Sequence, residues 1–136
     1  MISSYNSTTQ TVDSGAAYVF DTNRIVTGCT VGHVAGTSTF TLNKPGYYYV
    51  TFNTTFTTDA TGEVTVELQN GGILVPGATG TGTIATAGAT SSISFATIIK
   101  VLPSCPAVDN IATLTFVSTG IALDASVSNV NITKLC

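Results

Sequence analysis

The sequence predicts an all-β fold in which two antiparallel sheets pack face to face as a sandwich. Short runs of its 136 residues alternate apolar and polar side chains, which is the pattern of strands with one buried face. Gly, Pro and Asn interrupt these runs at turn-like intervals, and no sustained 3.6-residue apolar period predicts a helix. We therefore expect a single domain over residues 1–136, built from about eight to ten strands.

Two of the best-defined strands flank a Pro-Gly turn. Residues 37–42 alternate and stop at Asn43-Lys44-Pro45-Gly46. Residues 47–56 then resume as a long strand rich in aromatic and β-branched side chains. We expect two strands joined by a short turn.

The clearest hairpin follows directly. Residues 63–68 place three apolar side chains on one face and two carboxylates, Glu63 and Glu67, on the other. The turn Asn70-Gly71-Gly72 leads from there into the apolar residues 73–75. Two alternating segments joined by such a turn predict a β-hairpin.

The remaining segments have less regular patterns. Residues 1–7 are expected to form an N-terminal arm, and the Gly-, Ala- and Thr-rich residues 76–90 a long loop or a weak edge strand. The continuous apolar run over residues 93–102 predicts a strand buried on both faces, by the core and by a neighbouring subunit. Further strands are expected at residues 8–12, 18–21, 24–31, 111–117 and 127–135.

Charged residues are scarce, at 8% of the chain, whereas an average soluble domain has about a quarter. A lone protomer of this composition would leave a large apolar area wet, at a cost of about 25 cal/mol for each Å². The composition therefore predicts that identical copies cover part of the surface.

The net charge also limits the possible partners. With a formal charge of -3 and four Lys and Arg residues, the chain lacks the basic field that a phosphate backbone requires. No apolar run reaches the length of about 20 residues needed to span a bilayer. The first residues show neither the basic nor the hydrophobic region of a signal peptide. We expect neither nucleic acid nor membrane as a partner.

Two segments carry a resemblance to a known family. Residues 40–50 contain an apolar strand, a Pro-Gly-Tyr turn and a long aromatic strand, and residues 125–135 end in Asn-Ile-Thr-Lys-Leu. In both segments the chain resembles the jelly-roll family shared by the globular head of complement's first component and tumour necrosis factor, especially its short phage and bacterial members. The resemblance covers roughly residues 8–135 and implies a jelly-roll sandwich.

The resemblance further implies a compact homotrimer, with aromatic-rich strand faces packed around a threefold axis. Alternation in the long strand puts Tyr47, Tyr49 and Thr51 on the face opposite the core. We expect these side chains, together with Ile98, at the contact between subunits. The chain has no collagen-like Gly-X-Y stalk, so the globular domain alone would drive trimer formation.

The three cysteines, Cys29, Cys105 and Cys136, match neither a dense disulfide framework nor a zinc site. One interpretation is that all three are reduced thiols. The main alternative is a disulfide between Cys29 and Cys105, because each lies beside a turn-like segment. Cys136 could also meet its own copies around a symmetry axis.

No catalytic, cofactor-binding or metal site is predicted, so we expect a protein that is not an enzyme. His33 is the single histidine, and no nucleophile motif accompanies it. Three copies of His33 around an axis would be the one candidate metal site. Glu63 and Glu67 stand about 13 Å apart by strand rise, too far apart for catalysis by a carboxylate pair.

These observations favour a structural role on a bacteriophage virion, as a trimeric capsid decoration protein or as the head of a short fibre. The partners would be copies of the chain itself and the major capsid protein or another virion protein. Assembly would take place in the cytoplasm of the bacterial host, and the protein would end at the virion surface. Two alternatives stay open: a receptor- or glycan-binding fibre tip that uses the loops at residues 59–62 and 76–90, and a bacterial spore or cell-surface protein.

Overall fold

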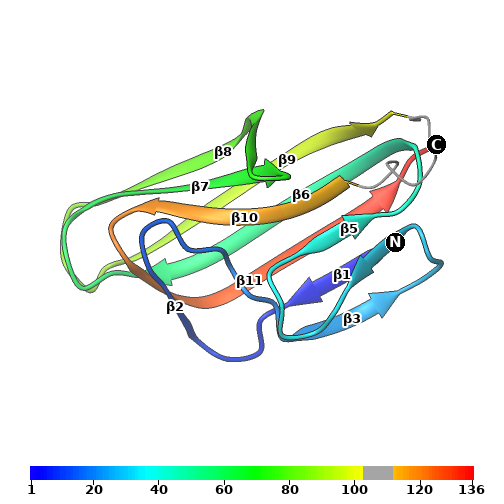
Figure 1. Cartoon of the computed structure of the whole chain (residues 1–136). Coiled ribbons are helices and arrows are strands. Elements are labelled where there is room, and N and C mark those ends of the chain that lie inside the picture. The colour runs from blue at the N-terminus through cyan, green and yellow to red at the C-terminus, as the bar shows by residue number, and fades with distance from the viewer. Residues whose placement is uncertain (103–111) are drawn as a thin grey trace.

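Strands make up nearly all of the regular structure (Figure 1). The computed structural model describes residues 1–102 and 112–136, and within these ranges it contains eleven strands and no helix. In chain order the strands are β1 Ile2–Tyr5, β2 Gln10–Val12, β3 Thr22–Val26, β4 Val31–His33, β5 Phe40–Leu42, β6 Gly46–Thr57, β7 Gly62–Asn70, β8 Ile73–Ile84, β9 Thr90–Val101, β10 Ala112–Gly120 and β11 Leu123–Lys134.

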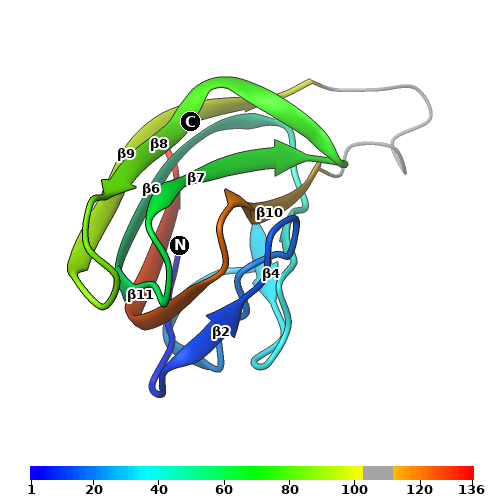
Figure 2. The same ribbon diagram turned by 90° about the vertical axis from the view of Figure 1, so that its left-hand side faces the viewer.

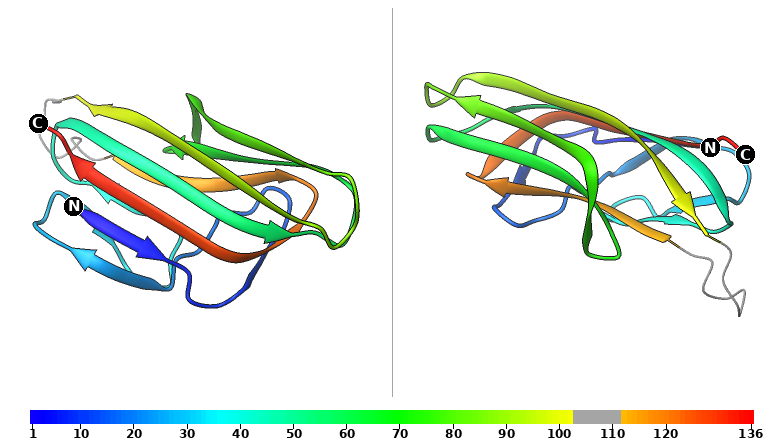
Figure 3. Two further views of the ribbon diagram at one scale, coloured as in Figure 1. Left: turned by 180° about the vertical axis from the view of Figure 1, so that it is seen from behind. Right: turned by 90° about the horizontal axis from the view of Figure 1, so that it is seen from above.

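Six strands form sheet A in the order β3-β1-β11-β6-β9, with β2 paired to the first residues of β11. The left view of Figure 3 shows this order from the β9 edge to the β3 edge. The long strands β6 and β11 run antiparallel over almost their whole length, from Lys134 opposite Tyr48 to Asp124 opposite Thr57. These two strands form the middle of the sheet.

The other five strands form sheet B in the order β4-β5-β10-β7-β8. Figure 2 shows the two sheets as separate layers, with β8 of sheet B beside β9 of sheet A along one side of the molecule. Every strand pair in both sheets is antiparallel. The prediction of an all-β sandwich of two antiparallel sheets is confirmed.

Aromatic side chains join the two sheets at the centre of the core. Phe52 of β6 stacks on Phe116 of β10 with ring centroids 4.9 Å apart, so one contact bridges sheet A and sheet B. Phe20 packs edge-on against Phe40 of β5 at 5.4 Å. All four rings are fully buried, and such ring pairs add about 0.5–1.5 kcal/mol beyond the area that they bury.

Two glycines allow β8 to approach β9 closely. A Cβ atom on Gly80 would lie 2.4 Å from Ile93 Cγ2, and one on Gly82 would lie 3.3 Å from Ser91 Oγ. Because both positions lack a side chain, Ile93 packs directly over the backbone of β8. The Gly-rich composition of this segment therefore closes one side of the sandwich.

The local sequence patterns give several strands correctly. The predicted hairpin is confirmed, since β7 and β8 pair with Asn70 opposite Ile73 across the Gly-Gly turn. In the last two strands, Phe116 and Ile132 are buried as the alternation predicted. The short turn after β5 also forms, but it leads from sheet B into sheet A, so β5 and β6 are not paired with each other.

The N-terminal residues form a strand rather than an arm. β1 lies between β3 and β11, with Ile2 opposite Val26 on one side and Ile132 on the other. Its pattern is hard to recognise because Ser3 and Ser4 are buried although they are polar. Ser4 Oγ is satisfied by donating to Asn23 Oδ1 at 2.6 Å.

Two further expectations in the N-terminal part are wrong. Residues 18–21 form one isolated bridge, between Phe20 and Thr37, rather than a strand, and a second bridge joins the preceding Ala17 to Val117. The single strand expected at residues 24–31 is divided into β3 and β4. Gly28 has a φ of 73° between them and reverses the chain.

The Gly-rich segment at residues 76–90 and the strand that follows it differ in part from the expectation. Of residues 76–90, the part up to Ile84 belongs to β8, which is an edge strand of sheet B. β9 buries one face, whereas its other face is open in the protomer, where Ile98 is 56% exposed. Residue 111, the first residue of the strand expected at residues 111–117, lies outside the described residues.

Candidate functional site: the outer face of sheet A

The outer face of sheet A carries the candidate site. Alternation along β6 buries Tyr48 and directs Tyr47 and Tyr49 away from the core. The antiparallel register then places Ile98 of β9 opposite Tyr49 and Thr51 opposite Ala96. The four side chains expected at a subunit contact therefore share one face of one sheet.

An apolar patch occupies the β9 side of this face and continues onto the start of β8 in sheet B. We define it as Tyr47, Tyr49 and Ile98 of sheet A together with Ile73 and Leu74 at the start of β8. Tyr49 is 42% exposed and Ile73 is 74% exposed. A hollow of about 350 Å³ lies between the start of β8 and the end of β9 and is lined in part by Leu74 and Ile98. Exposed apolar side chains gathered around a hollow are typical of a surface that another protein covers.

Lys100 lies at the border of the apolar patch. Its Nζ atom is 5.5 Å from the centroid of the Tyr47 ring, and Lys100 is opposite Tyr47 in the strand register. The aliphatic stem can cover apolar surface while the ammonium group stays in water.

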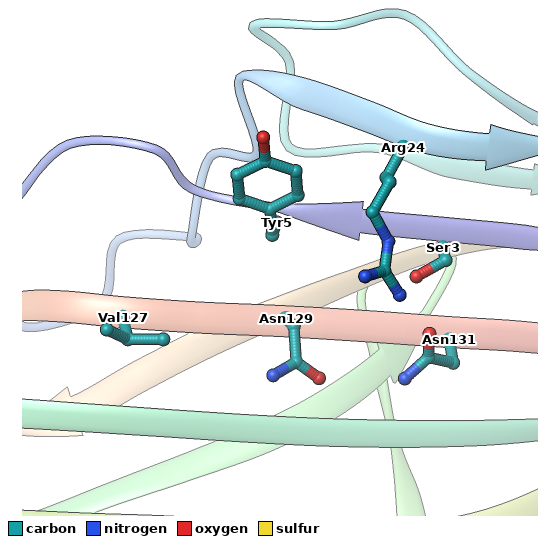
Figure 4. Close-up of a pocket in the computed structure, with 6 residues that line it drawn as sticks. All are labelled: Ser3, Tyr5, Arg24, Val127, Asn129 and Asn131. Atoms are coloured by element: carbon teal, nitrogen blue, oxygen red, sulfur yellow. The ribbon is translucent and has the colours of Figure 1, made fainter.

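A polar hollow of about 580 Å³ lies on the same face, over β1, β3 and β11 (Figure 4). Its lining residues are Ser3, Tyr5, Arg24, Val127, Asn129 and Asn131. In the close-up the Arg24 guanidinium crosses β1 toward Ser3. Across the sheet, Asn129 Oδ1 accepts from Asn53 Nδ2 at 3.3 Å, and Asn131 Nδ2 donates to Thr51 Oγ1 at 3.2 Å. These amides give the centre of the face a hydrogen-bonding rather than an apolar character.

His33 lies on β4, at the other edge of the sandwich from β8 and β9. Its ring stacks on Phe40 with centroids 4.2 Å apart. Nε2 contacts the carbonyl oxygen of Thr37 at 2.9 Å, and Nδ1 lies 2.6 Å from Asn23 Oδ1. Burial holds the pKa of His33 below its usual value, and the Thr37 contact opposes this only in part. The surroundings make His33 a partly buried structural residue.

Solved structures of three other proteins have a similar architecture. Eiger, a tumour necrosis factor from S. frugiperda, is similar with a TM-score of 0.73 at 11% identity, over 99% of this chain and 92% of that chain. Murine APRIL gives a TM-score of 0.71 at 10% identity, over 98% of each chain. The vertex protein P5 of phage PRD1 gives 0.59 at 16% identity, over 99% of this chain and 96% of that chain.

The chain has the tumour-necrosis-factor-like jelly-roll fold. This confirms the fold implied by the resemblance in residues 40–50 and 125–135. At identities between 10% and 16% the likeness concerns the fold alone. No protein-family model matches the sequence, and no curated protein matches it.

Two of the three cysteines, Cys29 and Cys136, lie in exposed positions of the jelly roll. Cys29 follows Gly28 in the connection between β3 and β4, and Cys136 follows β11; both are exposed. Cys105 lies outside the described residues, so its bridge with Cys29 stays a prediction.

Two carboxylates of the jelly roll, those of Asp21 and Asp124, accept hydrogen bonds from nearby residues. Asp124 accepts from Thr11 Oγ1 at 2.8 Å, and Asp21 accepts from the backbone N–H of Ser7 at 2.9 Å. The second contact lowers the pKa of Asp21. Across residues 1–102 and 112–136, no group of three or more His, Cys, Asp or Glu is placed to hold a metal ion. No helix in this part of the chain has the length and apolar character to cross a membrane.

The polar hollow could not be recognised in the sequence. Tyr5, Arg24 and Asn129 come from three strands, and β1 was not expected to be a strand. The available signal was weak: Arg24 is the single arginine of the chain. The polar residues Asn129 and Asn131 also alternate with the buried Val130 and Ile132.

Proposed function

We propose that this protein is a non-enzymatic structural component of a virion, a homotrimeric capsid decoration protein or the head of a short fibre. The apolar patch on the outer face of sheet A carries the proposal. Each Å² of apolar surface in this patch that a neighbouring copy covers contributes about 25 cal/mol to the hydrophobic free energy of association. A closed trimer gives every copy the same contact and leaves no unpaired patch.

Two further observations support the virion context. The fold is similar to that of the vertex protein of phage PRD1 over nearly the whole of both chains. Only 8% of the residues are charged, which suits a protein that is largely covered by others in an assembly. The second partner in this proposal is the capsid protein on which the trimer docks.

The test is to compare virions produced with and without the gene. Purified particles should contain the protein, and negative-stain images of particles from the deletion should lack a surface feature at symmetric positions. Specific antibody should label this feature on the complete particle. Absence of the protein from purified particles, with an unchanged particle surface, would contradict the proposal.

The polar hollow supports a second candidate, a fibre tip that binds a host glycan. A guanidinium group, a tyrosine and two amide side chains line one depression, and such groups recognise sugar hydroxyls and carboxylates. The loop expected at residues 76–90 is shorter than predicted, because β8 extends to Ile84. A glycan array with the purified trimer and an Arg24→Ala variant tests the candidate, and absence of specific binding would exclude it.

A further inference from the structure

Seven of the ten charged residues in the described chain lie at the two ends of the sandwich, whereas Asp21, Arg24 and Glu67 belong to neither end. At the end where β6 begins, Lys100 pairs opposite Tyr47 and Lys134 opposite Tyr48. Lys44 belongs to the same end, because its carbonyl oxygen accepts from Tyr48 Oη at 2.6 Å. We call this region, defined by Lys44, Lys100 and Lys134, the basic end. Figure 1 shows both chain termini there.

Four carboxylates lie at the opposite end. Asp59 follows β6, Glu63 lies at the start of β7, and Asp124 pairs opposite Thr57. Asp13 follows β2, next to the pairing of Val12 with Leu123. We call this region, defined by Asp13, Asp59, Glu63 and Asp124, the acidic end.

The two ends act as separate electrostatic surfaces. β6 spans them with 12 residues, which corresponds to about 36 Å at the rise of an antiparallel strand. The Debye length at physiological ionic strength is about 8 Å. A partner at one end is therefore screened from the charge at the other.

Apolar exposure separates the ends in the same way. At the basic end, Leu135 is 53% exposed and donates its backbone N–H to the Tyr47 carbonyl oxygen, and Val26 is 54% exposed opposite Ile2. Among the described residues, no large exposed hydrophobic side chain lies in residues 57–63 or 119–125 of the acidic end. Apolar surface with charged groups at its rim is the usual anatomy of a protein interface, whereas carboxylates without apolar neighbours suit a solvated surface.

We propose that the basic end is the docking end of the protein and that it binds an acidic surface of the capsid protein, with the acidic end facing solvent. This inference rests on the proposed virion function and adds the orientation of the protein and the charge of its partner surface. Lysines combined with exposed Leu135 and Val26 fit a protein surface, where charge steers encounter and apolar contact holds the complex.

The experiment measures binding of purified protein to particles produced without it. The wild type should co-sediment with these particles in about 50 mM NaCl and release in about 500 mM NaCl, because salt screens the lysines. The double variant Lys44→Glu/Lys134→Glu should bind about tenfold less or worse. Both residues lie outside the apolar patch, so the solution mass of this variant should stay that of the wild type. If the charge reversals unfold the protein, Lys44→Gln/Lys134→Gln serves in their place.

The matched control reverses two charges at the acidic end, as Asp59→Lys/Glu63→Lys, and should bind like the wild type. Equal binding by the lysine variant, or lost binding by this control, would overturn the docking orientation while leaving the virion function intact. Binding of the wild type to anionic lipid vesicles or duplex DNA, lost in the lysine variant, would overturn the choice of a protein partner. Failure of the wild type to bind particles, together with its absence from native virions, would overturn the proposed function itself.

Discussion

Two serine hydroxyls, Ser118 Oγ and Ser128 Oγ, are buried in the core and have no hydrogen-bond partner among residues 1–102 and 112–136. An unpaired buried hydroxyl costs about 1–3 kcal/mol in lost hydration. We expect Ser128→Ala to raise the free energy of unfolding by about 0.5–1 kcal/mol in urea titrations. The comparison variant Thr54→Val should lower it, because Thr54 Oγ1 donates to the Val127 carbonyl oxygen at 3.3 Å. A loss of stability in Ser128→Ala would show that the serine hydroxyl is satisfied.

His33 makes stability depend on pH. Because its pKa is lower in the folded protein than in the unfolded chain, the unfolded chain binds the proton more readily. The contribution of His33 to the free energy of unfolding is therefore fully present above the usual pKa of about 6.5. It is lost as the pH falls toward and through the lower pKa of the folded state. The midpoint of urea unfolding should be lower at about pH 5.5 than at about pH 7.5.

His33→Gln should remove most of this difference, since glutamine does not titrate. Asp21 contributes in a separate range, because its lowered pKa reduces stability only as the pH falls below the usual carboxyl range. An equal pH difference in the wild type and His33→Gln would show that another group is responsible.

At the scale of single elements, what the sequence could predict depends on how local the determining contacts are. The β7–β8 hairpin was recognisable because its alternation and its Asn-Gly-Gly turn lie within one short segment. β1 was not, because its strand pairing depends on Asn131 and Ile25, which are distant in the sequence from their partner Ser3. Tertiary pairing overrides weak local propensity in such strands.

The close approach of β8 to β9 gives a prediction at this scale. We expect Gly80→Ala to lower the free energy of unfolding by about 1–3 kcal/mol, because the new Cβ would lie 2.4 Å from Ile93 Cγ2. Thr83→Ala, three residues further along β8 and exposed, should change it by less than about 0.5 kcal/mol. Thermal or urea unfolding measures both, and equal effects would show that the strands separate without cost.

At the scale of the whole molecule, the candidate contact was only partly predictable. Tyr47, Tyr49, Thr51 and Ile98 were all expected at the contact, and the strand register places Ile98 opposite Tyr49 on the same face. The contribution of Ile73 from sheet B could not be anticipated, because it depends on how the two edges pack. The polar hollow could not be anticipated either, because its lining residues come from three strands that are distant in the sequence.

Tyr49→Glu tests the apolar patch as the contact between copies. A carboxylate opposite Ile98 would be buried without a partner in the trimer, which is strongly unfavourable. We expect the wild type to sediment as a trimer and the variant, at the same concentration, as a folded monomer. Thr81→Glu, on the outer face of sheet B, should leave the trimer intact. A trimeric Tyr49→Glu would place the subunit contact elsewhere.

The mass of the wild-type protein in dilute solution tests the central claim most directly. Light scattering with and without reductant should give three times the 13.9 kDa of one chain under both conditions, because apolar packing rather than a disulfide holds the copies together. A well-folded single chain at the same dilution would contradict the account.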